Sequence, residues 1–168
     1  MKKVLMVIAP NDFRDEEFSM PYELLKKNKI EITVASSTGK TSKGMLGKKV
    51  TPDKKLSDVS MNDFDAVVFV GGFGAQAYFN DPKCHELARQ ADQQKKLVSA
   101  ICIAPSILAN AGLLKGKTAT CWESEATNLK EKGAKYTGQP VEEDGRIVTG
   151  VGPDAAQKFA ETLLKRLK

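Results

Sequence analysis

The sequence predicts an α/β domain in which a doubly wound parallel sheet is sandwiched between helices. Short apolar runs of strand length alternate along the chain with segments of helical periodicity, a pattern typical of βαβ units. The run from Ala66 to Val70 is apolar at every position, as in central parallel strands that are buried on both faces. A length of 168 residues without an internal linker favours a single domain over residues 1–168.

Apolar runs and helical spacing define the elements of the first half of the chain. Strands are expected at residues 3–9, 30–35 and 66–70. Helical spacing follows the first strand at Phe18, Tyr22, Leu24 and Leu25. The polar residues 36–53 carry three glycines, so we expect an irregular excursion or a small hairpin there.

The second half continues the alternation. Helices are expected at 81–93, 103–111, 123–132 and 153–167, strands at 97–101 and 117–121, and a hairpin at 139–148. Asp81-Pro82 is a typical helix start, and Asp144-Gly145 is a typical hairpin turn. In doubly wound sheets the ligand crevice lies at the carboxyl ends of the strands. We therefore expect the functional residues after the strands at 3–9, 66–70 and 97–101.

Composition argues against several classes of protein. The net charge is +5, the lysines are scattered or lie near helix ends, and 7% of the residues are aromatic. Nucleic-acid-binding proteins more often show a basic stripe with interleaved aromatic residues, so no nucleic-acid partner is expected. The apolar runs are too short to span a membrane, and the apolar residues 4–10 lead into an acidic segment without a signal-peptide cleavage site. Three cysteines without disulfide spacing favour a reducing, cytoplasmic location.

Cys102 is the strongest candidate for chemistry, because it lies between the strand at 97–101 and the helix that follows. A side chain on a tight strand-to-helix turn is accessible, and the N–H groups of a helix N-terminus favour a thiolate. The alternative is that Cys102 is a small buried hydrophobic residue, as most free cysteines are. Cys84 and Cys121 lack the strand-to-helix context, so Cys102 is predicted to be the reactive thiol.

Two other features lie at the same expected edge of the sheet. Glu17 belongs to an acidic first helical turn, and the helix dipole alone can explain why acidic residues lie there. Pro21 is more specific, because it leaves the Glu17 carbonyl without its usual N–H partner and so marks an irregular backbone at Glu17. Gly71-Gly72 can be a simple turn, although a backbone without Cβ atoms also lets N–H groups approach a ligand. Together with the N–H of Ile103, these glycines could form an anion pocket beside the sulfur of Cys102.

Four motifs then occur in an order that resembles the ThiJ/PfpI superfamily over essentially the whole chain. They are Phe13-Arg14-Asp15-Glu16-Glu17 with Pro21, Val70-Gly71-Gly72, Ala100-Ile101-Cys102-Ile103-Ala104-Pro105, and Glu143-Asp144-Gly145 leading to Thr149-Gly150-Val151-Gly152-Pro153. The sequence is most similar to the branch of the parkinsonism-associated protein deglycases. The resemblance implies a flavodoxin-like sandwich, a homodimer, and a reactive cysteine hydrogen-bonded to a protonated glutamate.

The resemblance also assigns roles to individual residues. Cys102 corresponds to the reactive cysteine, and Glu17, four residues before Pro21, corresponds to its carboxyl partner. Gly72 and Ile103 correspond to the backbone donors of the oxyanion pocket. The residues expected to line the substrate site are Gly71, Phe73 and Trp122.

The sequence departs from the superfamily in its histidines. Ile103 stands where the proteases of the superfamily have a histidine, and Thr120-Cys121-Trp122 stands where the deglycase branch often has one. His85, the single histidine, falls in a polar helix away from Cys102. We therefore expect no peptidase activity, and one histidine with dispersed cysteines provides no metal site, so no cofactor is expected.

Two functions remain open at this point. The first is a glyoxalase or deglycase that acts on small carbonyl substrates such as methylglyoxal through Cys102 and Glu17. The second is a non-enzymatic oxidative-stress sensor or chaperone-like protein that depends on oxidation of Cys102.

Overall fold

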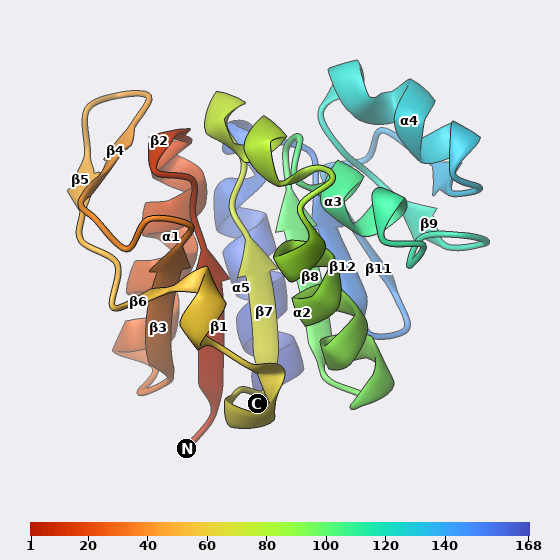
Figure 1. Cartoon of the computed structure of the whole chain (residues 1–168). Helices are drawn as coiled ribbons and strands as arrows, with labels where there is room; N and C mark the ends of the chain where they lie inside the picture. Colours follow the sequence, from red (N-terminus) through yellow and green to blue (C-terminus); the bar gives the residue numbers. More distant parts are fainter.

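The computed structural model describes residues 1–168 and places a central seven-stranded sheet between two layers of helices (Figure 1). The sheet contains β1 (Lys3–Val7), β3 (Glu31–Ser36), β6 (Lys54–Lys55), β7 (Ala66–Phe69), β8 (Leu97–Ile101), β11 (Val141–Asp144) and β12 (Ile147–Gly150). Their order across the sheet is β11-β12-β8-β7-β1-β3-β6. All neighbours are parallel except β11 and β12, which form the predicted hairpin. The predicted flavodoxin-like architecture is confirmed.

Five α-helices accompany the sheet: α1 (Asp15–Lys27), α2 (Pro82–Gln93), α3 (Pro105–Asn110), α4 (Ala126–Glu131) and α5 (Ala156–Leu167). α1 and α5 pack together on one face, and α2 and α3 cover the other (Figure 1). Each face has its own apolar core. Alternate residues of β1 serve the two cores: Val4 and Met6 face α1 and α5, while Leu5 and Val7 face α2.

Short strands form two small additional sheets. β2 (Asn11–Phe13), β4 (Ser42–Gly44) and β5 (Lys49–Val50) form one, and the antiparallel pair β4–β5 is the hairpin expected within residues 36–53. β9 (Thr118–Ala119) and β10 (Lys135–Tyr136) form the other. The strand expected at 117–121 is thus shorter than predicted and lies outside the central sheet. Strands of two or three residues carry too little alternation to be recognised in a sequence.

Three predicted helices are also shorter than expected. The segments predicted at 123–132 and 153–167 begin with 3₁₀ turns, at Glu123–Glu125 before α4 and at Pro153–Ala155 before α5, and the segment predicted at 103–111 is helical only over α3. Cys102, Ile103 and Ala104 form a turn ahead of α3.

The strand order explains where a ligand site can form. β1 is flanked by β3 and β7, so the chain reverses its direction of winding between β1 and β7. A crevice opens at such a switch point, beyond the carboxyl ends of the strands. The segments that follow β1, β7 and β8 meet at this edge, at the top of Figure 1, whereas both termini lie at the opposite edge. No helix is long and apolar enough to cross a membrane.

Candidate active site

Cys102 occupies a strained position directly after β8. Its φ angle is +67°, in the left-handed region that residues other than glycine rarely adopt. Backbone bonds hold it there: the Cys102 N–H donates to the Gly150 carbonyl at 2.9 Å, and the Cys102 carbonyl accepts from the Trp122 N–H at 2.8 Å. The predicted tight strand-to-helix turn is therefore present and fixes the direction of the side chain.

Glu17, from the first turn of α1, is completely buried and lies next to the thiol of Cys102. Its polar neighbours are that thiol and the N–H of Gly71, although neither meets full hydrogen-bond geometry. Gly71 creates the space, because a Cβ there would approach the Cβ of Cys102 to 2.5 Å and would collide with the Glu17 carboxyl. Burial raises the pKa of Glu17 to about 8, so the carboxyl is mostly protonated at neutral pH.

Burial also raises the pKa of the Cys102 thiol, and the charge of an ionised Glu17 is the second cause. The N–H groups of Gly72 and Ile103 act on the sulfur in the opposite direction. The charge effect is largely absent at neutral pH, because a protonated Glu17 carries none. Burial therefore affects the pKa of the Cys102 thiol more than the helix dipole that the sequence suggested. The dipole has little effect because α3 has only six residues and begins three positions after Cys102.

The thiol opens into a pocket of about 320 Å³. The lining residues are Arg14, Met45, Gly72, Phe73, Gln76, Cys102, Ile103, Trp122, Ser124, Glu125 and Pro153. Phe73 and Trp122 are 67% and 48% exposed, so each presents an aromatic ring to solvent at the pocket. Trp122 lies against the backbone of Gly152, where a Cβ would come within 2.7 Å of the indole ring.

The structure separates the predicted site residues into two groups. Gly72, Phe73, Cys102, Ile103 and Trp122 line the pocket. Glu17 and Gly71 do not line it. Gly71 was expected to bind substrate, but it lies between Glu17 and Cys102 and provides the space in which the two side chains meet.

Two charged residues of the pocket had no assigned role in the sequence analysis. Arg14 makes a bidentate ion pair with Glu16, at 2.9 and 3.0 Å, and its backbone N–H donates to the Gly71 carbonyl. Glu125 comes from the 3₁₀ turn before α4. Arg14 immediately precedes the acidic cluster, a signal that could have been used, whereas nothing in the spacing of Glu125 relates it to Cys102.

The remaining histidine and cysteines lie elsewhere. The Nε2 atom of His85 is 2.8 Å from the carbonyl of Phe79, and His85 does not line the pocket. Cys84 and Cys121 are completely buried, and burial raises the pKa of both thiols, that of Cys121 to about 12. No group of three or more histidine, cysteine or acidic side chains is arranged to hold a metal ion.

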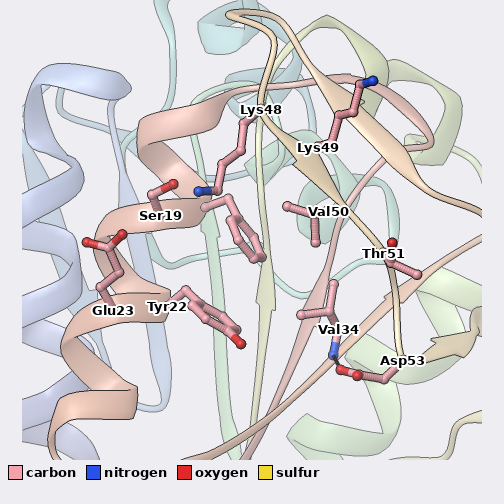
Figure 2. Close-up of a pocket in the computed structure, with 10 residues that line it drawn as sticks. Ser19, Tyr22, Glu23, Val34, Lys48, Lys49, Val50, Thr51 and Asp53 are labelled. Atoms are coloured by element: carbon pink, nitrogen blue, oxygen red, sulfur yellow. Dashed lines mark hydrogen bonds between the residues drawn. The ribbon is translucent and has the colours of Figure 1, made fainter.

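A second pocket of about 320 Å³ lies between α1 and the β4–β5 hairpin (Figure 2). Figure 2 shows Tyr22 and Val50 inside it, with the charged side chains of Glu23, Lys48 and Asp53 around them. It contains neither a cysteine nor a histidine. The pocket above Cys102 is therefore the candidate active site.

Together, the fold and this pocket define a flavodoxin-like α/β protein with a cysteine on a strand-to-helix turn and a buried carboxyl beside it. The model of the DJ-1/PfpI family matches residues 2–166, and the chain belongs to that family. The uncharacterised protein MJ0967 of Methanocaldococcus jannaschii is 43% identical over 99% of this chain and 82% of its own. A ThiJ/PfpI domain protein of Brachyspira murdochii superposes with a TM-score of 0.94 at 30% identity, covering 99% and 98% of the two chains.

Other relatives carry names for three different activities. YraA of Bacillus subtilis, which has a cysteine-protease name, is 34% identical over the full length of both chains. The protein/nucleic acid deglycase 2 of Escherichia coli is 31% identical over 99% of each chain. The glutathione-independent glyoxalase DJR-1.2 of Caenorhabditis elegans is 27% identical over 99% of this chain and 89% of its own.

Proposed function

We propose that this protein is a cysteine-dependent enzyme of the glyoxalase or deglycase type, acting on small reactive carbonyls such as methylglyoxal. One observation carries the proposal: the Cys102 thiol opens into a pocket of small-molecule size while its inner side contacts the carboxyl of Glu17. The names of two relatives, a deglycase and a glyoxalase, support the substrate class. Phe73 and Trp122 would offer apolar surface to the substrate's alkyl group.

The proposed first step is addition of Cys102 to the aldehyde. The reactive form has one proton on Glu17 and the negative charge on the sulfur, where the N–H groups of Gly72 and Ile103 oppose the cost of burial. The sulfur bonds to the aldehyde carbon, the carbonyl π electrons move to oxygen, and Glu17 supplies the proton that makes the hydroxyl of a hemithioacetal. The two N–H groups would also stabilise the developing oxygen charge.

The missing imidazole favours carbonyl addition over peptide hydrolysis. Peptide cleavage requires a base for the nucleophile and an acid for the departing amine. Ile103 provides neither, and His85 lies outside the pocket. Addition to an aldehyde has no leaving group, so one carboxyl can exchange the proton.

A second candidate function is oxidative sensing, with or without chaperone-like activity. The observation in its favour is the protonated Glu17, because a buried carboxylic acid can donate a hydrogen bond to an oxidised sulfur. Peroxide would oxidise Cys102 to the sulfenic acid, with one peroxide oxygen transferred to sulfur and the other released as water. This function requires no further catalytic group in the pocket.

One experiment separates the two functions. Lactate production from methylglyoxal is measured for the wild type and for Cys102→Ser, and the intact mass of both is measured after mild peroxide treatment. Lactate formation that depends on Cys102 supports the enzyme. Oxygen addition at Cys102 without lactate formation supports the sensor and rejects the enzyme.

We also propose a single-domain homodimer in a reducing, cytoplasmic compartment. All three cysteines are unpaired, which is typical of proteins kept in such a compartment. Met20 on α1 and Leu46 in the β4–β5 hairpin are exposed apolar side chains, 37% and 64% accessible, that a second copy would cover. Light scattering after size-exclusion chromatography tests the dimer: a monomer mass for the wild type rejects it, and Met20→Glu with Leu46→Glu is expected to weaken it.

A further inference from the structure

Glu125 is held in the pocket by two hydroxyl groups. One oxygen of its carboxyl accepts from the Ser106 hydroxyl at 2.7 Å, and the other accepts from the Ser124 hydroxyl at 3.0 Å. Glu125 and Cys102 line the same pocket. Because each carboxyl oxygen is hydrogen-bonded to a protein hydroxyl, the Glu125 carboxyl has a defined orientation.

A chain of hydrogen bonds fixes which partner donates. The amide of Asn128 donates to the Ser106 oxygen at 3.1 Å and to the Asn110 side-chain oxygen at 3.0 Å. Ser106 is completely buried, and its single hydroxyl proton is directed to Glu125. Glu125 therefore acts as an acceptor on both oxygens, which is the hydrogen-bonding state of an ionised carboxylate.

The proposed reaction needs such a group after the first step. Conversion of a hemithioacetal of methylglyoxal to lactate requires removal of the proton on the carbon that carries the sulfur. Glu17 lies beside the thiol and outside the pocket lining, so it is less well placed than a pocket residue to reach that carbon. Among the lining residues, Arg14 is the only other ionisable group besides Cys102 and Glu125, and an arginine at neutral pH cannot accept a proton.

We propose that Glu125 is a second catalytic carboxylate, which moves a proton between the two carbonyl-derived carbons of the Cys102-bound substrate. This role rests on the proposed glyoxalase function. Glu125 takes the proton from the sulfur-bearing carbon and returns it to the neighbouring carbon, while a hydroxyl proton passes from the first oxygen to the second through an enediol. The product is a lactoyl thioester on Cys102, and water then releases lactate and regenerates the thiol.

A purely structural role would be that Glu125 ties α4 to α3 through Ser106. Glu125→Gln distinguishes the two roles, because the amide oxygen still accepts from Ser106 and the amide nitrogen can donate to the Ser124 oxygen. The variant thus keeps both contacts and removes the base. Glu123→Gln is the matched control, since Glu123 lies in the same 3₁₀ turn, carries the same charge and does not line the pocket.

The experiment measures lactate turnover and the intact mass of each variant during incubation with methylglyoxal. We expect Glu125→Gln to lower turnover by a factor on the order of 10²–10⁴, typical of a lost general base. A methylglyoxal adduct on Cys102 should accumulate in this variant, because addition does not use Glu125. Glu123→Gln should match the wild type, and Glu125→Asp, which keeps a carboxylate, should retain part of the turnover.

The other possible results would overturn either the role of Glu125 alone or the proposed function as well. Turnover of Glu125→Gln within about threefold of the wild type overturns the role of Glu125 and leaves the proposed function standing. Loss of both turnover and adduct in Glu125→Gln, with Glu125→Asp equally inactive, assigns Glu125 a structural role and also overturns it. Absence of Cys102-dependent lactate in the wild type rejects the proposed function and this inference together.

Discussion

The Glu17 carboxyl lies against the Cys102 thiol across the space that Gly71 leaves open. One residue belongs to the first helix and the other follows the fourth long strand of the sheet, so only the folded chain brings them together. Both groups are buried, and each makes it harder for the other to carry a negative charge. Four predictions test this pair and the pocket above it.

Replacement of Glu17 should change the pH dependence of Cys102 alkylation. The wild-type pair is expected to lose its first proton near pH 8, from Glu17, and the charge on Glu17 then opposes ionisation of the thiol, so the rise in alkylation rate should flatten above that pH. In Glu17→Gln this charge is absent, so the rate should keep rising above pH 8 toward the pKa of the thiol, which burial alone still raises. Iodoacetamide rates between pH 6 and 10 provide the measurement. Identical profiles for the wild type, Glu17→Gln and Glu17→Ala would show that the two groups are not coupled.

The same buried carboxyl should make the protein less stable as the pH rises. The pKa of Glu17 is raised on folding from its ordinary value near 4.5 to about 8, so the folded state binds the extra proton within this interval. Its contribution to stability is fully present below about pH 4.5 and is lost as the pH approaches 8. One pKa unit corresponds to about 1.4 kcal/mol, so the expected loss is several kcal/mol.

Urea unfolding at pH 5, 6.5 and 8 measures this loss, and Glu17→Gln should flatten the dependence. Glu16→Gln is the control from the same helical turn. The ion pair with Arg14 lowers the pKa of Glu16, so Glu16 titrates below the range tested and its removal should leave the slope unchanged. A wild-type free energy of unfolding that rises from pH 5 to pH 8 would contradict the prediction.

Cys102 should be the most reactive of the three thiols. It is 8% exposed at the base of the pocket, whereas Cys84 and Cys121 are completely buried and do not line this pocket. Alkylation at neutral pH followed by peptide mapping should label Cys102 first, and Cys102→Ser should lose that label. Preferential labelling of Cys84 or Cys121 in the folded protein would contradict this prediction.

Purified protein should not cleave casein or fluorogenic peptides under conditions in which it consumes methylglyoxal. The pocket lacks an imidazole, and the indole N–H of Trp122 is a donor that does not exchange protons at neutral pH. Ile103→His should be required before any cleavage is detected. Cleavage by the wild type that disappears in Cys102→Ala would restore the protease interpretation, which the name of YraA suggests for that relative.

The fold class, the alternation of strands and helices, and the position of Cys102 on a turn were all predicted from the amino-acid sequence. These properties are local. An apolar run such as Ala66–Val70 and the glycines that end it can be recognised from neighbouring residues and their spacing alone. The resemblance to a family added Glu17 as the partner of Cys102. The short strands β2, β6 and β10 were not predicted and β9 was predicted too long, because each owes its pairing to a distant segment rather than to its own pattern.

The tertiary structure was needed to establish the chemistry at the sheet edge. It placed Gly71 between Glu17 and Cys102 rather than in the substrate pocket, and it made burial, not a helix dipole, the main influence on the thiol. It also brought Glu125 into the pocket through Ser106. Desolvation and hydrogen bonding depend on the atoms around a group in space, and residues from four separate segments supply those atoms here.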